Sequence, residues 1–209
     1  MHSIVSVTTV PERTALTTVD RVKLELSITT DASDALLAIK INEASSDIEA
    51  HLSRTLAYAG LTQTFWGEGT ADYLILDRAP VGSIASVTLD DDLVDSDEYR
   101  LDADSGILYR LDSSGYPCTW YWCKSVVIVF TGGYELPGAD DPTLPPAIEA
   151  AAVELVTSYW TARGRDPTVR AEDIPGIGSV TYWVGAVGEA GGLPPSVTSK
   201  IAPFRRVQL

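Results

Sequence analysis

Few side chains in this sequence have the types and spacing that catalysis requires. There are only two histidines, His2 and His51, and His51 falls beside the apolar stripe of a predicted helix, which favours a structural role. The sequence contains no nucleotide-binding glycine loop, no nucleophile elbow and no zinc-protease motif. Because catalysis needs a positioned nucleophile, base or metal, we expect a protein that is not an enzyme and that carries no cofactor.

Two acidic clusters are the only candidates for a divalent cation. Residues 90–92 are consecutive aspartates, and Asp102 and Asp104 have the spacing that opens a calcium-binding loop. A complete loop needs a glutamate at its twelfth position, which here is Ser113. A β-turn rich in Asp and Gly explains the segment without a metal. An enzyme that uses these carboxylates with a bound metal therefore stays only as a minor alternative.

The segment 116–123 combines aromatic rings with the only two cysteines, Cys118 and Cys123. The cysteines lack the second pair or the histidines of a zinc site and do not make a disulfide framework, so buried thiols are favoured. Trp120 and Trp122 could stack on sugars or contact another protein. A carbohydrate- or peptide-binding module built on this segment is the alternative function, although core packing of about half of the rings is favoured.

The distribution of charge indicates which partners are excluded. The chain of 209 residues has a net charge of −14, and residues 61–140 carry 14 acidic and 4 basic side chains. Such a field repels nucleic acid, so a protein that grips DNA is not expected. No apolar run is long enough to span a membrane and no secretory signal is visible, so we expect the chain to be made and used in a cytoplasm.

Apolar residues at helical spacing predict three helices around a stretch of strands. The stripe Leu37, Ile41, Ala44, Ile48 and Leu52 lies in a helix predicted over Asp34–Arg54. A shorter helix over Thr18–Leu26 precedes it, another covers Ala147–Ala162, and the region between them alternates with the period of strands. The expected fold class is α+β, with a mainly helical core of two long helices plus a short N-terminal helix, an inserted small antiparallel β unit and an extended C-terminal tail. The expected domains are residues 1–56 plus 141–195 for the helical core, 57–140 for the β subdomain and 196–209 for the tail.

Two passages carry a resemblance to a known family. They are FTGGYELPGADDPTLPPAIEAA at residues 130–151 and the ending LPPSVTSKIAPFRR at residues 193–206. With the helices around them, they make residues 16–206 similar to the head–tail connector family of phages, also called adaptor or head-completion proteins and also found in phage-like gene transfer agents.

The resemblance implies a structural virion protein at the head–tail interface, or neck, assembled in the host cytoplasm. Its subunits would form a ring, typically of twelve copies, that joins the capsid portal to the tail and continues the DNA channel. The implied partners are the portal protein, a tail-side connector or tail-terminator protein, and further copies of the chain. Double-stranded DNA would pass through without specific binding, and no membrane is involved.

The tail and one loop are the expected contact elements. The last 14 residues contain three basic side chains and no acidic one, which suits docking on an acidic surface. The implied portal-docking residues are Lys200, Ile201, Pro203, Phe204, Arg205 and Arg206, and the implied subunit or partner contacts are Arg163, Arg165, Arg170, Trp120 and Trp122.

Overall fold

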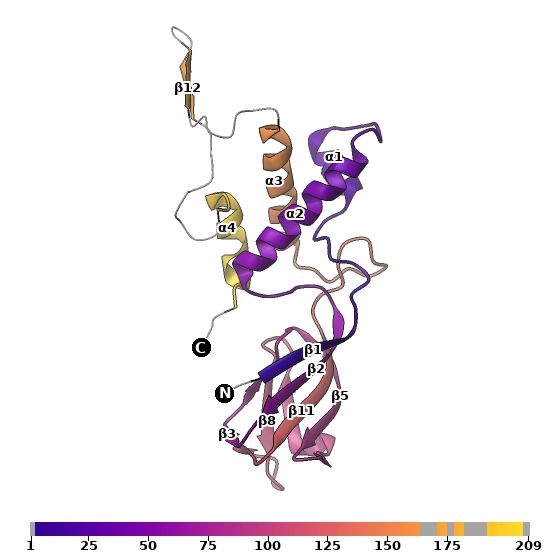
Figure 1. Ribbon diagram of the computed structural model, residues 1–209, viewed down its shortest axis with the longest axis vertical. Coiled ribbons are helices and arrows are strands. Elements are labelled where there is room, and N and C mark those ends of the chain that lie inside the picture. The colour runs from indigo at the N-terminus through magenta and orange to yellow at the C-terminus, as the bar shows by residue number, and fades with distance from the viewer. Residues whose placement is uncertain (1–2, 164–170, 175–177, 182–191, 207–209) are drawn as a thin grey trace. The chain divides into compact units, whose positions relative to one another are not determined.

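The chain divides into two compact units. The computed structural model describes residues 3–163, 171–174, 178–181 and 192–206. The first unit comprises residues 1–13 and 55–135 and is built from strands, whereas the second comprises residues 14–54 and 136–209 and is mainly helical (Figure 1).

An antiparallel sheet of five strands forms the larger part of the first unit. Its central strand, β11, alternates between buried and half-buried side chains, so that Val126, Ile128 and Phe130 face the core. Across the sheet the order is β1 (Ser3–Thr9), β2 (Ala59–Trp66), β11 (Ser125–Gly132), β5 (Val81–Leu89) and β6 (Asp92–Leu93).

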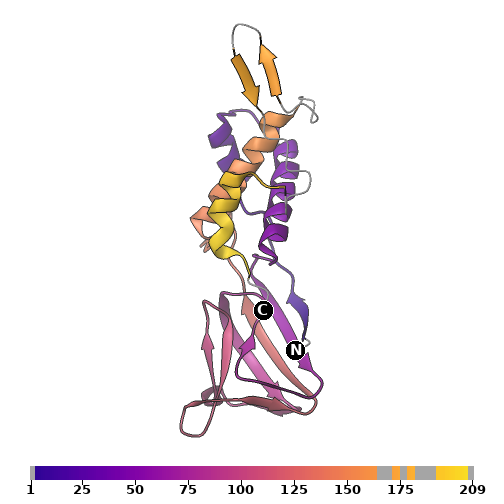
Figure 2. The same cartoon turned by 90° about the vertical axis from the view of Figure 1, so that its left-hand side faces the viewer.

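Shorter strands close the other side of this core (Figure 2). Strand β8 pairs with three neighbours, and a separate pair of three-residue strands carries the tryptophans described below. The bounds are β3 (Gly69–Ala71), β4 (Leu74–Ile75), β7 (Tyr99–Asp102), β8 (Ile107–Leu111), β9 (Pro117–Cys118) and β10 (Trp120–Trp122), with a 3-10 turn, η1, at Ser96–Glu98.

The carboxylate of Asp90 fixes the acidic turn at the end of β5. It accepts hydrogen bonds from the backbone N–H groups of Cys123, Lys124 and Ser125 at 2.7, 2.7 and 3.0 Å. These bonds lower the pKa of the Asp90 carboxyl, because they favour its ionised form. Asp90 and Asp91 have left-handed backbones, which Asp tolerates better than most residues. This cluster is therefore explained by turn structure.

The second unit packs its helices along apolar stripes. All five residues of the stripe predicted from the sequence are buried on α2, at most 2% exposed. The side chain of Thr18 caps the first helix by accepting the N–H of Arg21. The elements are α1 (Val19–Leu26), α2 (Asp34–Leu52), α3 (Pro146–Ala162), the ribbon of β12 (Ala171–Ile174) and β13 (Gly178–Thr181), α4 (Pro195–Ile201) and a 3-10 turn, η2, at Ala202–Phe204.

The predicted fold class is wrong, although the helices begin and end close to their predicted bounds. Among the described residues, more lie in strands than in α-helices, the strands form several antiparallel sheets, and none of the four helices exceeds 19 residues. The β part is no small insert, because it has a core of its own with fourteen buried residues and takes its edge strand β1 from the N-terminus. The C-terminal segment is not extended, because Pro195–Ile201 is helical.

Candidate docking site

The C-terminal segment that carries the predicted docking residues is folded against the helical unit. Helix α4 packs on α3, and its residues Val197 and Ile201 are 0% exposed. Pro194 and Pro195 open the helix, where a missing N–H costs no intrahelical bond. The spacing of the two buried residues, four apart, places them on one face of α4. Burial of this face anchors the segment.

Polar contacts hold the same segment at its exposed side. The carboxylate of Glu154 on α3 accepts the hydroxyl of Ser196 and forms an ion pair with Lys200. The Lys200 ammonium, and secondly the Ser196 hydroxyl, hold the pKa of the Glu154 carboxyl below its usual range. Beyond η2, the N–H of Arg206 donates to the carbonyl of Leu52 at 3.1 Å, at the C-terminal end of α2.

This arrangement divides the predicted docking residues into anchors and surface groups. Ile201 is buried and cannot contact a partner while α4 is docked. Pro203 and Arg205 are exposed, whereas Phe204 is half-buried and Arg206 is partly covered. The side chain of Lys200 is 42% exposed but already paired with Glu154. Their role in docking remains a prediction, and the surface it could use is Pro203, Phe204 and Arg205.

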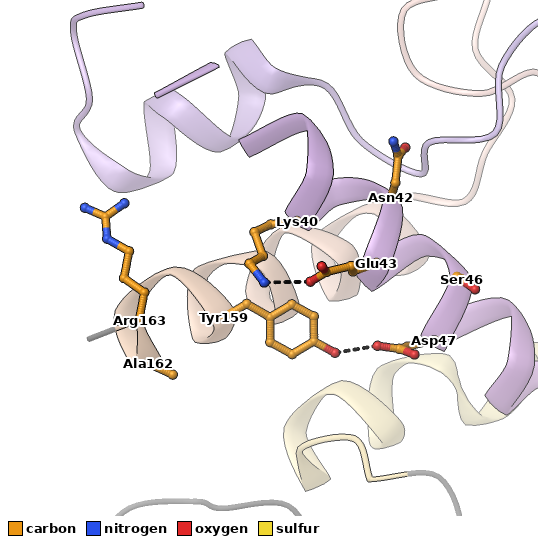
Figure 3. Close-up of a pocket in the computed structure, with 8 residues that line it drawn as sticks. All are labelled: Lys40, Asn42, Glu43, Ser46, Asp47, Tyr159, Ala162 and Arg163. Carbon is orange, nitrogen blue, oxygen red and sulfur yellow. Dashed lines mark hydrogen bonds and ion pairs between the residues drawn. The ribbon is translucent and has the colours of Figure 1, made fainter. Parts of the chain in front are cut away.

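A polar groove lies between α2 and α3 (Figure 3). The hydroxyl of Tyr159 donates to Asp47 at 2.6 Å, and the ammonium of Lys40 donates to Glu43 at 2.7 Å. Burial, and secondly the bond to Asp47, raises the pKa of the Tyr159 hydroxyl. The cavity measures about 770 Å³ and is lined by Lys40, Asn42, Glu43, Ser46, Asp47, Tyr159, Ala162 and Arg163. Four of the lining side chains are thus paired within the groove, Tyr159 with Asp47 and Lys40 with Glu43.

The predicted loop contacts begin at the end of α3. Arg163 is exposed, and its guanidinium carbon lies 3.2 Å from the ring centroid of Trp160, a cation–π contact. This contact fixes the direction of Arg163 at the rim of the groove. Arg165 and Arg170 lie outside the described residues. The contact role of all three arginines stays a prediction.

The two tryptophans predicted as contact residues belong to the core. Trp120 and Trp122 are 1% and 2% exposed, and the indole N–H of Trp120 donates to the carbonyl of Leu108 at 3.1 Å. Strand alternation in β10 turns Tyr121 outward between them, and Tyr116 is also exposed. Half of the cluster is therefore core, as favoured from the sequence. The assignment of Trp120 and Trp122 to a partner contact, or to a sugar-stacking platform, is corrected by their burial.

Metal ligands, thiols and long apolar helices are the other features that could mark a site. Within the part of the chain that the structure describes, no three His, Cys, Asp or Glu side chains are grouped to hold a metal ion. Cys118 and Cys123 are both free thiols, but Cys118 is only half-buried and Cys123 is exposed, so the expectation of buried thiols is wrong. None of the described helices is long and apolar enough to cross a membrane.

Sequence reasoning missed two features of the molecule. It did not anticipate the hydrogen bond between Asp47 and Tyr159, because no local pattern relates side chains that lie 112 positions apart in the sequence. It also assigned no element to the N-terminal residues, although the β-branched run in Ser3–Thr9 is typical of a strand.

Comparison with known proteins supports the resemblance drawn from the sequence. Residues 16–76 match the family model of the phage gp6-like head-tail connector proteins. No curated protein gives a significant match. Among solved structures, a chain from the neck of an empty gene transfer agent (GTA) particle, computed with C6 symmetry, is 22% identical, with a TM-score of 0.59 over 99% of this chain and 97% of that chain.

Two further chains show the same fold. One, from the neck of a native GTA particle computed with C12 symmetry, is 21% identical with a TM-score of 0.55. The other, from the virion of a native GTA particle, is 19% identical with a TM-score of 0.57. Both alignments cover 99% of this chain and 97% of the other. The predicted resemblance to the head–tail connector family is confirmed.

Proposed function

We propose, from this family resemblance, that the chain is a non-enzymatic subunit of a head–tail connector in a phage or gene transfer agent. Copies of it would form a ring, of twelve subunits in the simplest case, at the neck of the particle. The ring would join the portal to the tail side and continue the channel through which double-stranded DNA passes.

One observation carries the proposal. The chain shares its fold, over 99% of its length, with chains from GTA necks, and the connector family model matches residues 16–76, which hold α1, α2 and strands β2 to β4. The fold alone does not define a function. The fold match and the family match both point to the neck of a particle, where a head–tail connector lies, and together they support the proposal.

The charge of the chain fits a conduit for DNA. A channel wall that held its cargo tightly would stop it, and a net charge of −14 opposes tight binding to phosphates. A closed ring also needs two different complementary patches on each subunit, because each subunit contacts one neighbour through one surface and the other neighbour through a second surface. The contact of the ring with portal and tail proteins is part of the proposal.

The surface next to η2 is the portal-docking site that we propose. Pro203 and Arg205 are exposed at the end of a segment that α3 holds in place through Val197 and Ile201. A segment whose backbone is already anchored loses less conformational entropy on docking than a free tail, and a complementary acidic surface would steer the encounter.

Negative-stain imaging of the purified chain, alone and with its cognate portal, tests the function. A ring on one end of the portal is the expected result and would give the symmetry directly. Separate particles in both samples, at concentrations well above the micromolar range of transient contacts, would refute the connector assignment.

A charge reversal at Arg205 tests the docking site. We expect Arg205→Glu to weaken portal binding at least ~10-fold, and Ser199→Glu, on an exposed position of α4, to weaken it less. Removal of residues 196–209 is a poor test, because it strips Val197 and Ile201 from the core. Equal binding by Arg205→Glu and the unchanged chain would place the docking site elsewhere.

A further inference from the structure

Two carboxylates face the groove between α2 and α3, but only one of them is paired with a cation. Glu43 forms an ion pair with Lys40 at 2.7 Å, whereas Asp47 accepts the neutral hydroxyl of Tyr159 at 2.6 Å (Figure 3). In the part of the chain that the structure describes, no basic side chain pairs with Asp47. Two carboxylates and one ammonium therefore leave this part of the groove with an excess negative charge.

The other cation of the lining, Arg163, does not balance this charge. Its guanidinium carbon lies 3.2 Å from the ring centroid of Trp160, and its side chain points away from Asp47 (Figure 3). Pairing with Asp47 would require Arg163 to give up its cation–π contact with Trp160. The excess negative charge is thus a stable property of the groove.

One oxygen of each carboxylate remains as an acceptor. Lys40 bonds to Oε2 of Glu43 and Tyr159 bonds to Oδ2 of Asp47, so Oε1 of Glu43 and Oδ1 of Asp47 accept nothing within the described residues. Residues four apart on a helix have Cβ atoms ~5–6 Å from each other, so the two carboxylates are neighbours. A guanidinium carries five N–H donors in a flat fork that can span two such groups, whereas an ammonium is a single point of charge.

We propose that the groove between α2 and α3 binds an arginine side chain of a basic protein other than this chain, with the guanidinium bridging Glu43 and Asp47. The cavity of about 770 Å³ has the size of sites that enclose a ligand, so it would admit the arginine with the residues beside it. The amide of Asn42 and the hydroxyl of Ser46 also line the cavity and could bond to the backbone of that segment.

Charge favours a basic protein over a second copy as the occupant. Two copies of a chain with a net charge of −14 repel each other, whereas a basic protein is attracted. Most of the described basic side chains already contact an acidic group, a carbonyl or an aromatic ring, which leaves few arginines of a second copy to enter the groove. The side chains with such contacts are Arg21, Lys23, Lys40, Arg78, Arg110, Lys124, Arg163 and Lys200.

Titration of the isolated chain with short peptides, followed by NMR, tests the site. The probes are acetyl-Gly-Arg-Gly-amide and the same peptide with citrulline, which keeps the shape of arginine without its charge. We expect the arginine peptide to shift the signals of residues 40–47 and of Tyr159, and to bind at least ~5-fold tighter than the citrulline peptide. A lysine peptide should bind more weakly than the arginine peptide, because it cannot span both carboxylates.

Three variants separate this site from a general attraction to an acidic protein. Asp47→Asn keeps an oxygen for the Tyr159 hydroxyl but removes the charge, and should weaken binding of the arginine peptide by ~5-fold. The matched control, Asp140→Asn, removes the same charge at an exposed position outside the groove and should leave binding unchanged. Lys40→Gln removes the competing cation and should strengthen binding.

Equal binding of the arginine and citrulline peptides would overturn the proposal, as would equal effects of the two Asn variants or weaker binding by Lys40→Gln. Light scattering tests the occupant. An oligomer of the unchanged chain that Asp47→Asn separates into monomers, while Asp140→Asn does not, would assign the groove to a second copy. These measurements need no portal, so their failure would leave the proposed connector function untouched, and the reverse also holds.

Discussion

Truncation of Ile201 tests whether the C-terminal segment is part of the folded core. Ile201 is 0% exposed on α4, packed on α3. Ile201→Ala removes three carbon groups, which at ~0.8 kcal/mol each gives about 2.4 kcal/mol in lost burial. A residual cavity adds to this, and Ile→Ala substitutions in cores cost ~2–5 kcal/mol. We expect a loss of about 2–3 kcal/mol, because α4 lies at the end of the unit and can relax.

The assay must report on this unit and not on the whole chain. Hydrogen exchange measured by mass spectrometry on the peptide over residues 193–206 gives the local opening free energy. A loss of 2–3 kcal/mol speeds exchange by roughly 30- to 150-fold where opening is at equilibrium. The matched control is Pro203→Ala, an exposed position in η2, for which no such change is expected. If Ile201→Ala and Pro203→Ala exchange alike, the segment is a free tail and the docked α4 is wrong.

Two other perturbations address the contact between Glu154 and Lys200 and the aromatic core of the first unit. The folded pKa of Glu154 lies below its unfolded value of ~4.3, so the unfolded chain binds protons more readily than the folded chain. The contact of the Glu154 carboxylate with Lys200 therefore stabilises α4 above about pH 4.3 and is lost as pH falls through the folded pKa. Exchange at residues 193–206 should therefore rise, after correction for intrinsic rates, between pH 5 and pH 3, and Glu154→Gln should flatten this dependence; an unchanged profile would contradict the assignment. In the first unit, Trp122→Ala should lower the free energy of unfolding by ~3–5 kcal/mol in urea titrations, whereas its exposed neighbour Tyr121→Ala should change it by under ~1 kcal/mol. Similar losses in both variants would contradict the assignment of Trp122 to the core and of Tyr121 to the surface.

The helices were the predictable part of this fold. A stripe at helical spacing identifies which face is buried whatever it packs against, and all five predicted stripe residues of α2 are buried. The strands of the first unit are set by pairing between distant segments, such as β2 with β11, which no local pattern encodes. The N-terminal strand β1, which joins the β part only by pairing with β2, was missed for this reason.

The candidate site was harder to predict than the helices. The composition of the tail is basic and polar, which is typical of a solvated terminus, but two apolar residues four apart were enough to dock it. The aromatic segment 116–123 shows the opposite error. Trp120 and Trp122 have a chemistry suited to contacts, but alternation along a three-residue strand turned both inward. Residue type alone did not separate an interface from a core.

The discontinuous order of the two units has a consequence for synthesis on the ribosome. The central strand β11 lies between β2 and β5, so the sheet lacks its central strand until residue 132 has emerged from the ribosome. Helices α1 and α2, made first, lack their packing partner α3 until residue 162 has followed. Long sequence separation between contacts slows folding, and unpaired apolar segments then stay exposed on the nascent chain. Helix α1 stays longest without its partner α3, whereas β1 can pair with β2 once residue 66 has emerged, so α1 is the segment that a chaperone would most usefully cover.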